Sequence, residues 1–142
     1  LARPAPAIAA PRAARILVVE DNEVNQLLIT RMLAKGGHDV RLARDGEQAI
    51  RRLERERFDL VFMDVHLPGM DGVTAARRIR ELRPPLDRVP IIALTADAMM
   101  GDRDRYLAAG MDDYLSKPID ARILHATIAR ALSPSSRQAC SA

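Results

Sequence analysis

The chain alternates five times between a short apolar or alternating run and a segment whose apolar residues repeat at helical spacing. Such runs, bounded by turn residues, predict strands at 15–20, 38–43, 60–63, 89–94 and 112–116. Helices are predicted from the "DN" at 21–22 to the "KGG" at 35–37, and over 45–57, 73–82, 102–110 and 120–132. Strands that alternate with helices in this way predict an α/β fold, with one five-stranded parallel sheet and helices on both faces.

The first and last helices have the clearest local signals. In the first, the apolar residues at helical spacing are Val24, Leu27, Leu28 and Met32. In the last, Asp120 is the expected N-cap, because a carboxylate there accepts hydrogen bonds from the free backbone N–H groups of the first turn.

Charge and composition limit the possible classes of function. The 142 residues, 48% of them hydrophobic, suffice for one domain with a substantial core. The net charge is +3, but arginines alternate with acids, as in "EQAIRRLERER", so we expect no direct nucleic-acid contact. No apolar run approaches the length of a membrane span, so we expect no membrane contact by this segment. The single cysteine, Cys140, fits a reducing compartment, and we expect a cytoplasmic location.

Composition also changes at both ends of the chain. Residues 1–14 are rich in Ala, Pro and Arg and predict a linker. Residues 133–142, "SPSSRQACSA", predict a disordered tail. The folded domain is therefore expected over 15–132.

Polar residues follow the predicted strands at the ends that a parallel sheet brings together. They are Glu20 and Asp21 after the first strand, Asp64 after the third, Thr95 and Ala96 after the fourth, and Lys117 after the fifth. In open α/β sheets, functional groups collect beyond the carboxyl ends of the strands. These side chains are therefore expected to converge on one edge of the sheet.

A divalent cation would balance the charge of this set. The three carboxylates raise one another's pKa unless a cation lies between them. Mg²⁺ (or Mn²⁺) prefers such oxygen ligands, and with Lys117 it would neutralise the three acids. A carboxylate such as Asp64 also serves as a nucleophile that forms an aspartyl phosphate. Lys117 would then neutralise phosphoryl oxygens, Thr95 would donate a hydrogen bond, and small Ala96 would leave its N–H approachable.

Four motifs carry a family resemblance. They are "ILVVEDN" (16–22), "FMDVHLPGMDG" (62–72), "IIALTA" (91–96) and "DDYLSKPI" (112–119). Together they resemble the receiver domain of two-component response regulators, over roughly residues 14–132. The resemblance implies a flavodoxin-like (βα)5 fold with strand order 2-1-3-4-5, which agrees with the alternation of strands and helices.

The resemblance implies a role for each acid at the strand ends. Asp64 corresponds to the phosphoacceptor, and Glu20 and Asp21 correspond to the acidic pair of the metal site. The backbone carbonyl of His66 would complete the set of metal ligands.

The remaining positions correspond to the switch and to the control of phosphoryl lifetime. Thr95 and Tyr114 match the switch hydroxyl and the switch aromatic residue, and Lys117 matches the phosphate-binding lysine. His66 and Asp97 lie two residues after Asp64 and Thr95, at positions that tune how fast the acyl phosphate hydrolyses.

The resemblance also implies a place in a phosphorelay. The donor would be a phosphohistidine of a histidine kinase domain or of a histidine phosphotransfer protein. Self-phosphorylation and autodephosphorylation would be the only activities of this segment, and phosphorylation would switch the face formed by 102–110, 112–116 and 120–132. "VEDNEVNQLLITRML" is most like receivers at the C-terminal end of hybrid sensor histidine kinases. The linker would then tether the domain to a kinase, which is membrane-bound in some such systems.

Three alternatives stay open at this point. A stand-alone single-domain regulator has the same motifs. A phosphorylation-independent pseudo-receiver usually lacks part of the acid set, the threonine or the lysine, all of which are present here. A metal-dependent phosphohydrolase with an aspartate nucleophile would carry a second acid where this chain has His66, which argues against it.

Overall fold

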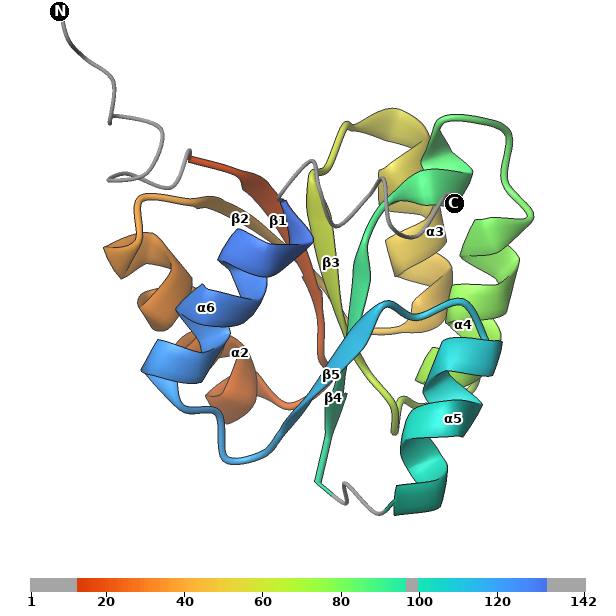
Figure 1. The fold of residues 1–142 in the computed structure, drawn as a ribbon. Coiled ribbons are helices and arrows are strands. Elements are labelled where there is room, and N and C mark those ends of the chain that lie inside the picture. The colour runs from red at the N-terminus through yellow and green to blue at the C-terminus, as the bar shows by residue number, and fades with distance from the viewer. Residues whose placement is uncertain (1–12, 97–99, 133–142) are drawn as a thin grey trace, which may run out of the picture.

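The computed structural model describes residues 13–96 and 100–132, and its elements follow the predicted alternation (Figure 1). The strands are β1 (Arg15–Val19), β2 (Asp39–Ala43), β3 (Leu60–Asp64), β4 (Ile91–Thr95) and β5 (Asp113–Ser116). The α-helices are α2 (Glu23–Lys35), α3 (Gly46–Arg55), α4 (Gly72–Arg80), α5 (Met100–Ala108) and α6 (Ala121–Ala131), and a 3-10 helix, η1 (Leu86–Arg88), precedes β4. Nearly all of the predicted linker and tail lies outside the described residues, so these domain limits remain predictions.

The five strands form one parallel sheet in the order β2-β1-β3-β4-β5, which confirms the predicted flavodoxin-like order. In the register of the central strands, Val18 of β1 lies opposite Phe62 of β3, and Met63 of β3 lies opposite Ala93 of β4. Because all the strands run in one direction, their carboxyl ends lie at the same edge of the sheet. Residues far apart in the sequence therefore meet at that edge.

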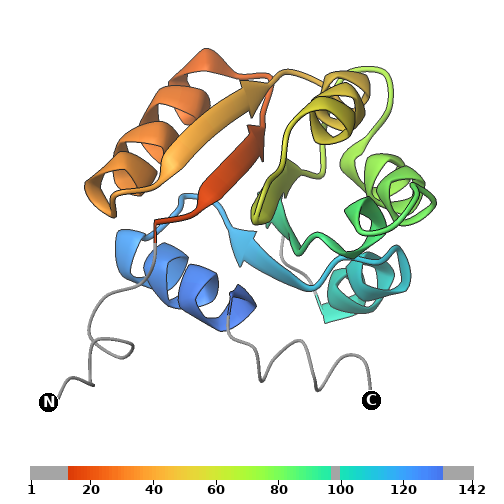
Figure 2. The same cartoon turned by 90° about the horizontal axis from the view of Figure 1, so that it is seen from above.

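Helices cover both faces of the sheet, as the alternation predicts. Helices α2 and α6 lie on one face, and α3, α4 and α5 lie on the other (Figure 2). Alternate residues of each strand point to opposite faces, so Ile16 and Val18 pack under α2 and α6, whereas Leu17 and Val19 pack under α3 to α5. No helix in the described part of the chain combines the length and the apolar composition needed to cross a bilayer.

Helix α2 begins after its N-cap, Asn22, but its buried face differs from the most conspicuous apolar repeat in the sequence. The side chains buried against the sheet are Ile29 and Leu33. Val24, Leu27 and Leu28 are exposed, with 73%, 54% and 46% of their surface accessible. The helix carries two apolar stripes, and helical periodicity alone does not indicate which one faces the sheet.

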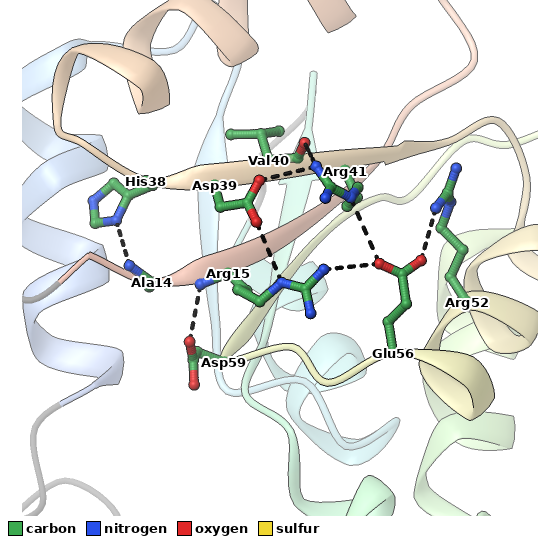
Figure 3. A network of polar contacts seen from close by, with 9 residues as sticks. All are labelled: Ala14, Arg15, His38, Asp39, Val40, Arg41, Arg52, Glu56 and Asp59. Atoms are coloured by element: carbon green, nitrogen blue, oxygen red, sulfur yellow. Dashed lines mark hydrogen bonds and ion pairs between the residues drawn. The ribbon is translucent and has the colours of Figure 1, made fainter.

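Ion pairs join β1, β2 and α3 at the amino ends of the strands (Figure 3). Glu56 accepts from Arg15 and Arg52, each at 2.9 Å, and lies 3.6 Å from Arg41. Asp39 pairs with Arg15 at 3.3 Å and with Arg41 at 2.9 Å. Exposed pairs of this kind contribute about 0–1 kcal/mol each, so they stabilise this edge only modestly.

Candidate functional site

Three carboxylates meet at the edge of the sheet where β1 and β3 end. Glu20 and Asp21 follow β1 directly, and Asp64 is the last residue of β3. One oxygen of each carboxylate lies within 4.8 Å of the other two, so the predicted convergence of the acids is confirmed. Glu20 and Asp64 are buried, with 1% and 4% of their surface exposed, whereas Asp21 is open to solvent.

Lys117 joins two of these acids from the loop after β5. Its Nζ atom donates to Oε1 of Glu20 and to Oδ2 of Asp64, each at 3.0 Å. Burial alone would lower the pKa of Lys117, but the hydrogen bonds and charges of Glu20 and Asp64 outweigh burial and raise it above its ordinary value. The lysine is therefore protonated at neutral pH and compensates one of the negative charges.

The start of α2 holds Glu20 in place. Oε2 of Glu20 accepts from the backbone N–H of Asn22 at 3.1 Å. The Gln26 side-chain amide donates to the Glu20 carbonyl at 2.5 Å. Asn22 is also the N-cap of α2, where its Oδ1 accepts from the N–H groups of Val24 and Asn25. Sequence reasoning missed Gln26, because nothing local indicates that a helical glutamine reaches back to the strand end.

The loop after β3 folds back onto Asp64. Oδ1 of Asp64 accepts from the N–H of His66 at 3.0 Å, and the N–H of Gly72 donates to the Val65 carbonyl at 2.9 Å. A Cβ atom on Gly72 would clash with the backbone carbonyl oxygen of Asp64. Only glycine therefore allows α4 to begin this close to the end of β3.

Thr95 lies at the end of β4 and is fully buried. Its Oγ1 accepts from the hydroxyl of Tyr106 on α5 at 3.2 Å, and its carbonyl accepts from the N–H of Lys117 at 2.8 Å. Ala96 follows in the exposed loop. Tyr114, on β5, is partly buried, and its ring centroid lies 6.4 Å from that of Tyr106. Sequence reasoning also missed Tyr106, because nothing local indicates that a tyrosine of the helix predicted over 102–110 reaches the end of β4.

Of the two residues predicted to tune the hydrolysis of the acyl phosphate, the structure describes only His66. The His66 side chain is exposed beside the acids, on the loop between β3 and α4. Asp97 lies outside the described residues. The roles inferred for both residues remain predictions.

Known proteins are similar to this chain in sequence and in fold. Residues 16–129 match the family model described as the response regulator receiver domain. The chain belongs to that family. The matched range includes all five strands except the first residue of β1, and it contains all four motifs found in the sequence.

Two solved receiver domains are similar over almost their whole length. One, from a sensor histidine kinase of Pseudomonas aeruginosa PAO1, has a magnesium ion coordinated in its active-site cleft. It is 48% identical, with 85% of this chain and 98% of that chain covered and a TM-score of 0.78. The other is the receiver domain of Ssk1 from Saccharomyces cerevisiae, solved with the histidine phosphotransfer protein Ypd1. It is 32% identical, with 83% and 88% covered and a TM-score of 0.77.

Curated relatives of this receiver domain are much longer proteins. Hybrid signal transduction histidine kinase G of Dictyostelium discoideum is 43% identical over 118 residues, which cover 82% of this chain. That match covers 3% of the kinase. The chain therefore spans a small part of such a kinase, and the resemblance concerns the receiver segment.

The donor set of this receiver domain fits a hard divalent cation. Glu20, Asp21 and Asp64 offer only carboxylate oxygens, which suit Mg²⁺ or Mn²⁺ better than metals that prefer thiolate or imidazole. Their three negative charges, less the positive charge of Lys117, leave two to be neutralised. Asp21 is exposed, so an ion that keeps several water ligands has room at this position.

Proposed function

We propose that this receiver domain accepts a phosphoryl group on Asp64 from a phosphohistidine and acts as a switch in a phosphorelay. The observation that carries the proposal is the Asp64 carboxylate, buried at the sheet edge between Glu20, Asp21 and the Nζ atom of Lys117. A nucleophile needs little more than positioning and charge stabilisation for phosphoryl transfer. These neighbours supply both.

The reaction follows from the atoms that surround Asp64. A carboxylate oxygen of Asp64 attacks phosphorus, while the phosphorus–nitrogen bond breaks and its electron pair returns to the donor imidazole. Lys117 neutralises one phosphoryl oxygen, the Thr95 hydroxyl donates to another, and the backbone N–H of Ala96 is available to a third. Hydrolysis later returns the free carboxylate, at a rate that His66 and Asp97 would tune.

Glu20, Asp21, Asp64 and the backbone carbonyl of His66 would hold Mg²⁺, or Mn²⁺ in its place. When bound, the ion neutralises oxygens of the transferring phosphoryl group and holds them against the nucleophile. The magnesium-containing relative from Pseudomonas aeruginosa supports this assignment.

The phosphodonor would dock on the exposed apolar side chains near the acids. Val24, Leu27 and Leu28 lie on α2, which begins three residues after Glu20, and Ile123 lies on α6 over the same face of the sheet. The fitting partner is the histidine-bearing helical domain of a kinase or a histidine phosphotransfer protein. The complex of Ssk1 with Ypd1 supports such a partner.

The long curated relatives support a proposal for the biological setting. We assign the chain to the receiver segment of a hybrid histidine kinase facing the cytoplasm, with residues 1–14 as the tether to a membrane-bound kinase. The kinase activity belongs to the parent protein, and a stand-alone regulator is the alternative. Phosphorylation would bias the face formed by α5, β5 and α6 between two arrangements.

The test is phosphorylation by acetyl phosphate or by a phosphorylated histidine donor in the presence of Mg²⁺. We expect the protein to incorporate phosphate and Asp64→Asn to abolish incorporation. Asp45→Asn is the matched control, because Asp45 follows β2 at the same edge and serves as the N-cap of α3, a role that asparagine also fills. Normal incorporation by Asp64→Asn contradicts the assignment of the phosphoacceptor.

A further inference from the structure

The hydroxyl groups of Tyr106 and Thr95 form a buried link between α5 and the end of β4. The Tyr106 hydroxyl donates to Oγ1 of Thr95 at 3.2 Å. Thr95 is 0% exposed and Tyr106 is 3% exposed. A hydrogen bond in this setting has little competition from water, and breaking it leaves a buried polar atom to be satisfied elsewhere.

The contacts of Tyr106 show which way the Thr95 hydroxyl faces. Tyr106 belongs to the apolar cluster under α3, α4 and α5. Its ring lies 6.4 Å from that of Tyr114, and the Arg105 guanidinium carbon lies 6.0 Å from its centroid. Oγ1 of Thr95 therefore accepts a hydrogen bond from the packed interior beneath α5.

We propose that Tyr106 is a positioning residue that holds the Thr95 hydroxyl in the unphosphorylated state and couples its release to α5. This inference rests on the proposed phosphorylation of Asp64. A threonine side chain has few χ1 rotamers, so turning its hydroxyl toward a phosphoryl oxygen takes it away from Tyr106. The Tyr106 hydroxyl is then buried without this acceptor, and α5 has to shift to give it another.

Removing the Tyr106 hydroxyl should strengthen the binding of a phosphoryl mimic. Tyr106→Phe keeps the ring and removes the hydroxyl, so it removes a bond that the unphosphorylated state makes and the phosphorylated state breaks. Beryllofluoride with Mg²⁺ mimics the phosphoryl group, and we expect the variant to bind it about 2- to 10-fold more tightly than the wild type, measured by titration calorimetry.

A matched control separates this role from a general loss of stability. Thr127 is buried on α6, and its Oγ1 donates to the Ile123 carbonyl at 2.8 Å. Thr127→Val also deletes a buried hydroxyl bond, but it leaves Thr95 untouched, so beryllofluoride affinity should stay within about 2-fold of the wild type. Unchanged or weaker binding by Tyr106→Phe overturns the proposal.

A spectroscopic measurement covers the case in which Tyr106→Phe fails to fold. The chain has no tryptophan and two tyrosines, so Tyr114→Phe leaves Tyr106 as the only tyrosine emitter. We expect beryllofluoride with Mg²⁺ to change its fluorescence, and constant emission at saturation overturns the proposal. If the wild type does not bind beryllofluoride, or if Asp64→Asn binds it equally well, the proposed function itself is overturned. The failure of the proposed function and the failure of this inference are therefore distinguishable.

Discussion

The Nζ atom of Lys117 lies 3.0 Å from Oδ2 of Asp64, although 53 residues separate them in the sequence. The same atom donates to Glu20, so one ammonium group neutralises part of the charge of two buried carboxylates. This bridge links the ends of β1 and β3 to the loop after β5. It makes the stability of the fold depend on the charge balance of the site.

Lys117→Met removes the ammonium group and keeps an apolar side chain of similar length. We expect the free energy of unfolding in EDTA to fall by about 1–3 kcal/mol, because two buried acceptors lose a charged donor. Mg²⁺ should restore part of this loss, and urea denaturation with and without Mg²⁺ measures both effects. Equal stability of variant and wild type in EDTA contradicts the prediction.

Lys117 should also make the free energy of unfolding depend on pH. Its pKa is raised in the folded state, so its contribution to stability is complete below the pKa of an unfolded lysine. The contribution is lost as the pH rises through the folded value. The difference in unfolding free energy between wild type and Lys117→Met should therefore be constant near neutral pH and shrink in strongly alkaline buffer.

Asp21→Asn should separate metal binding from folding, because Asp21 is the exposed member of the acidic set. Mg²⁺ at ten times its Kd should stabilise the wild type by about 1.4 kcal/mol, and the variant should lose most of this gain. Without metal, the variant should be at least as stable as the wild type, because one source of carboxylate repulsion is gone. Thermal unfolding with and without Mg²⁺ measures both, and an unchanged Mg²⁺ effect in Asp21→Asn contradicts the metal assignment.

Arg80→Lys tests a guanidinium that joins three segments on the α5 side of the sheet. Arg80, the last residue of α4, donates to the Gly110 carbonyl at 2.8 Å, to the Val89 carbonyl at 2.6 Å and to the Asp112 carboxylate at 3.0 Å. Lysine cannot reproduce this fork of donors. We expect a loss of about 1–3 kcal/mol in the free energy of unfolding, from urea denaturation.

The control for this variant is a more exposed arginine. Arg130 pairs with Asp113 at 2.8 Å, and its side chain is 65% exposed. Arg130→Lys should change the free energy of unfolding by less than about 0.5 kcal/mol. Lysine keeps the positive charge in both variants, so a loss in Arg80→Lys no larger than that in Arg130→Lys would contradict the role assigned to the planar donor geometry of Arg80.

His38 should make the free energy of unfolding depend on pH as well, on the acid side of neutrality. Its Nδ1 accepts from the N–H of Ala14 at 3.1 Å (Figure 3), and burial, with the charge of His125, lowers its pKa. The unfolded chain then binds this proton more readily than the folded protein does. Stability should fall as the pH drops below the ordinary histidine pKa of about 6.5. Urea denaturation between about pH 5.5 and 7 should show this slope, and an equal slope in His38→Gln contradicts it.

Local patterns in the sequence determined the elements of this receiver domain and the residues at the strand ends. Apolar runs and caps depend on neighbouring residues, so the strands and most helix limits could be predicted. A parallel sheet brings its carboxyl ends to one edge, which is why the convergence of Glu20, Asp21, Asp64 and Lys117 could be expected from the sequence alone.

Only the tertiary structure decided which apolar stripe of α2 is buried and which hydroxyl meets Thr95. Ile29 and Leu33 face the sheet, although Leu27 and Leu28 are equally apolar. Packing against the sheet decides the rotation of the helix about its own axis, and this rotation decides which stripe is buried. Tyr106 reaches Thr95, and Arg80 reaches Asp112, across segments that only the packed fold brings together. Such contacts depend on how elements distant in the sequence pack together, and local sequence patterns do not determine that packing.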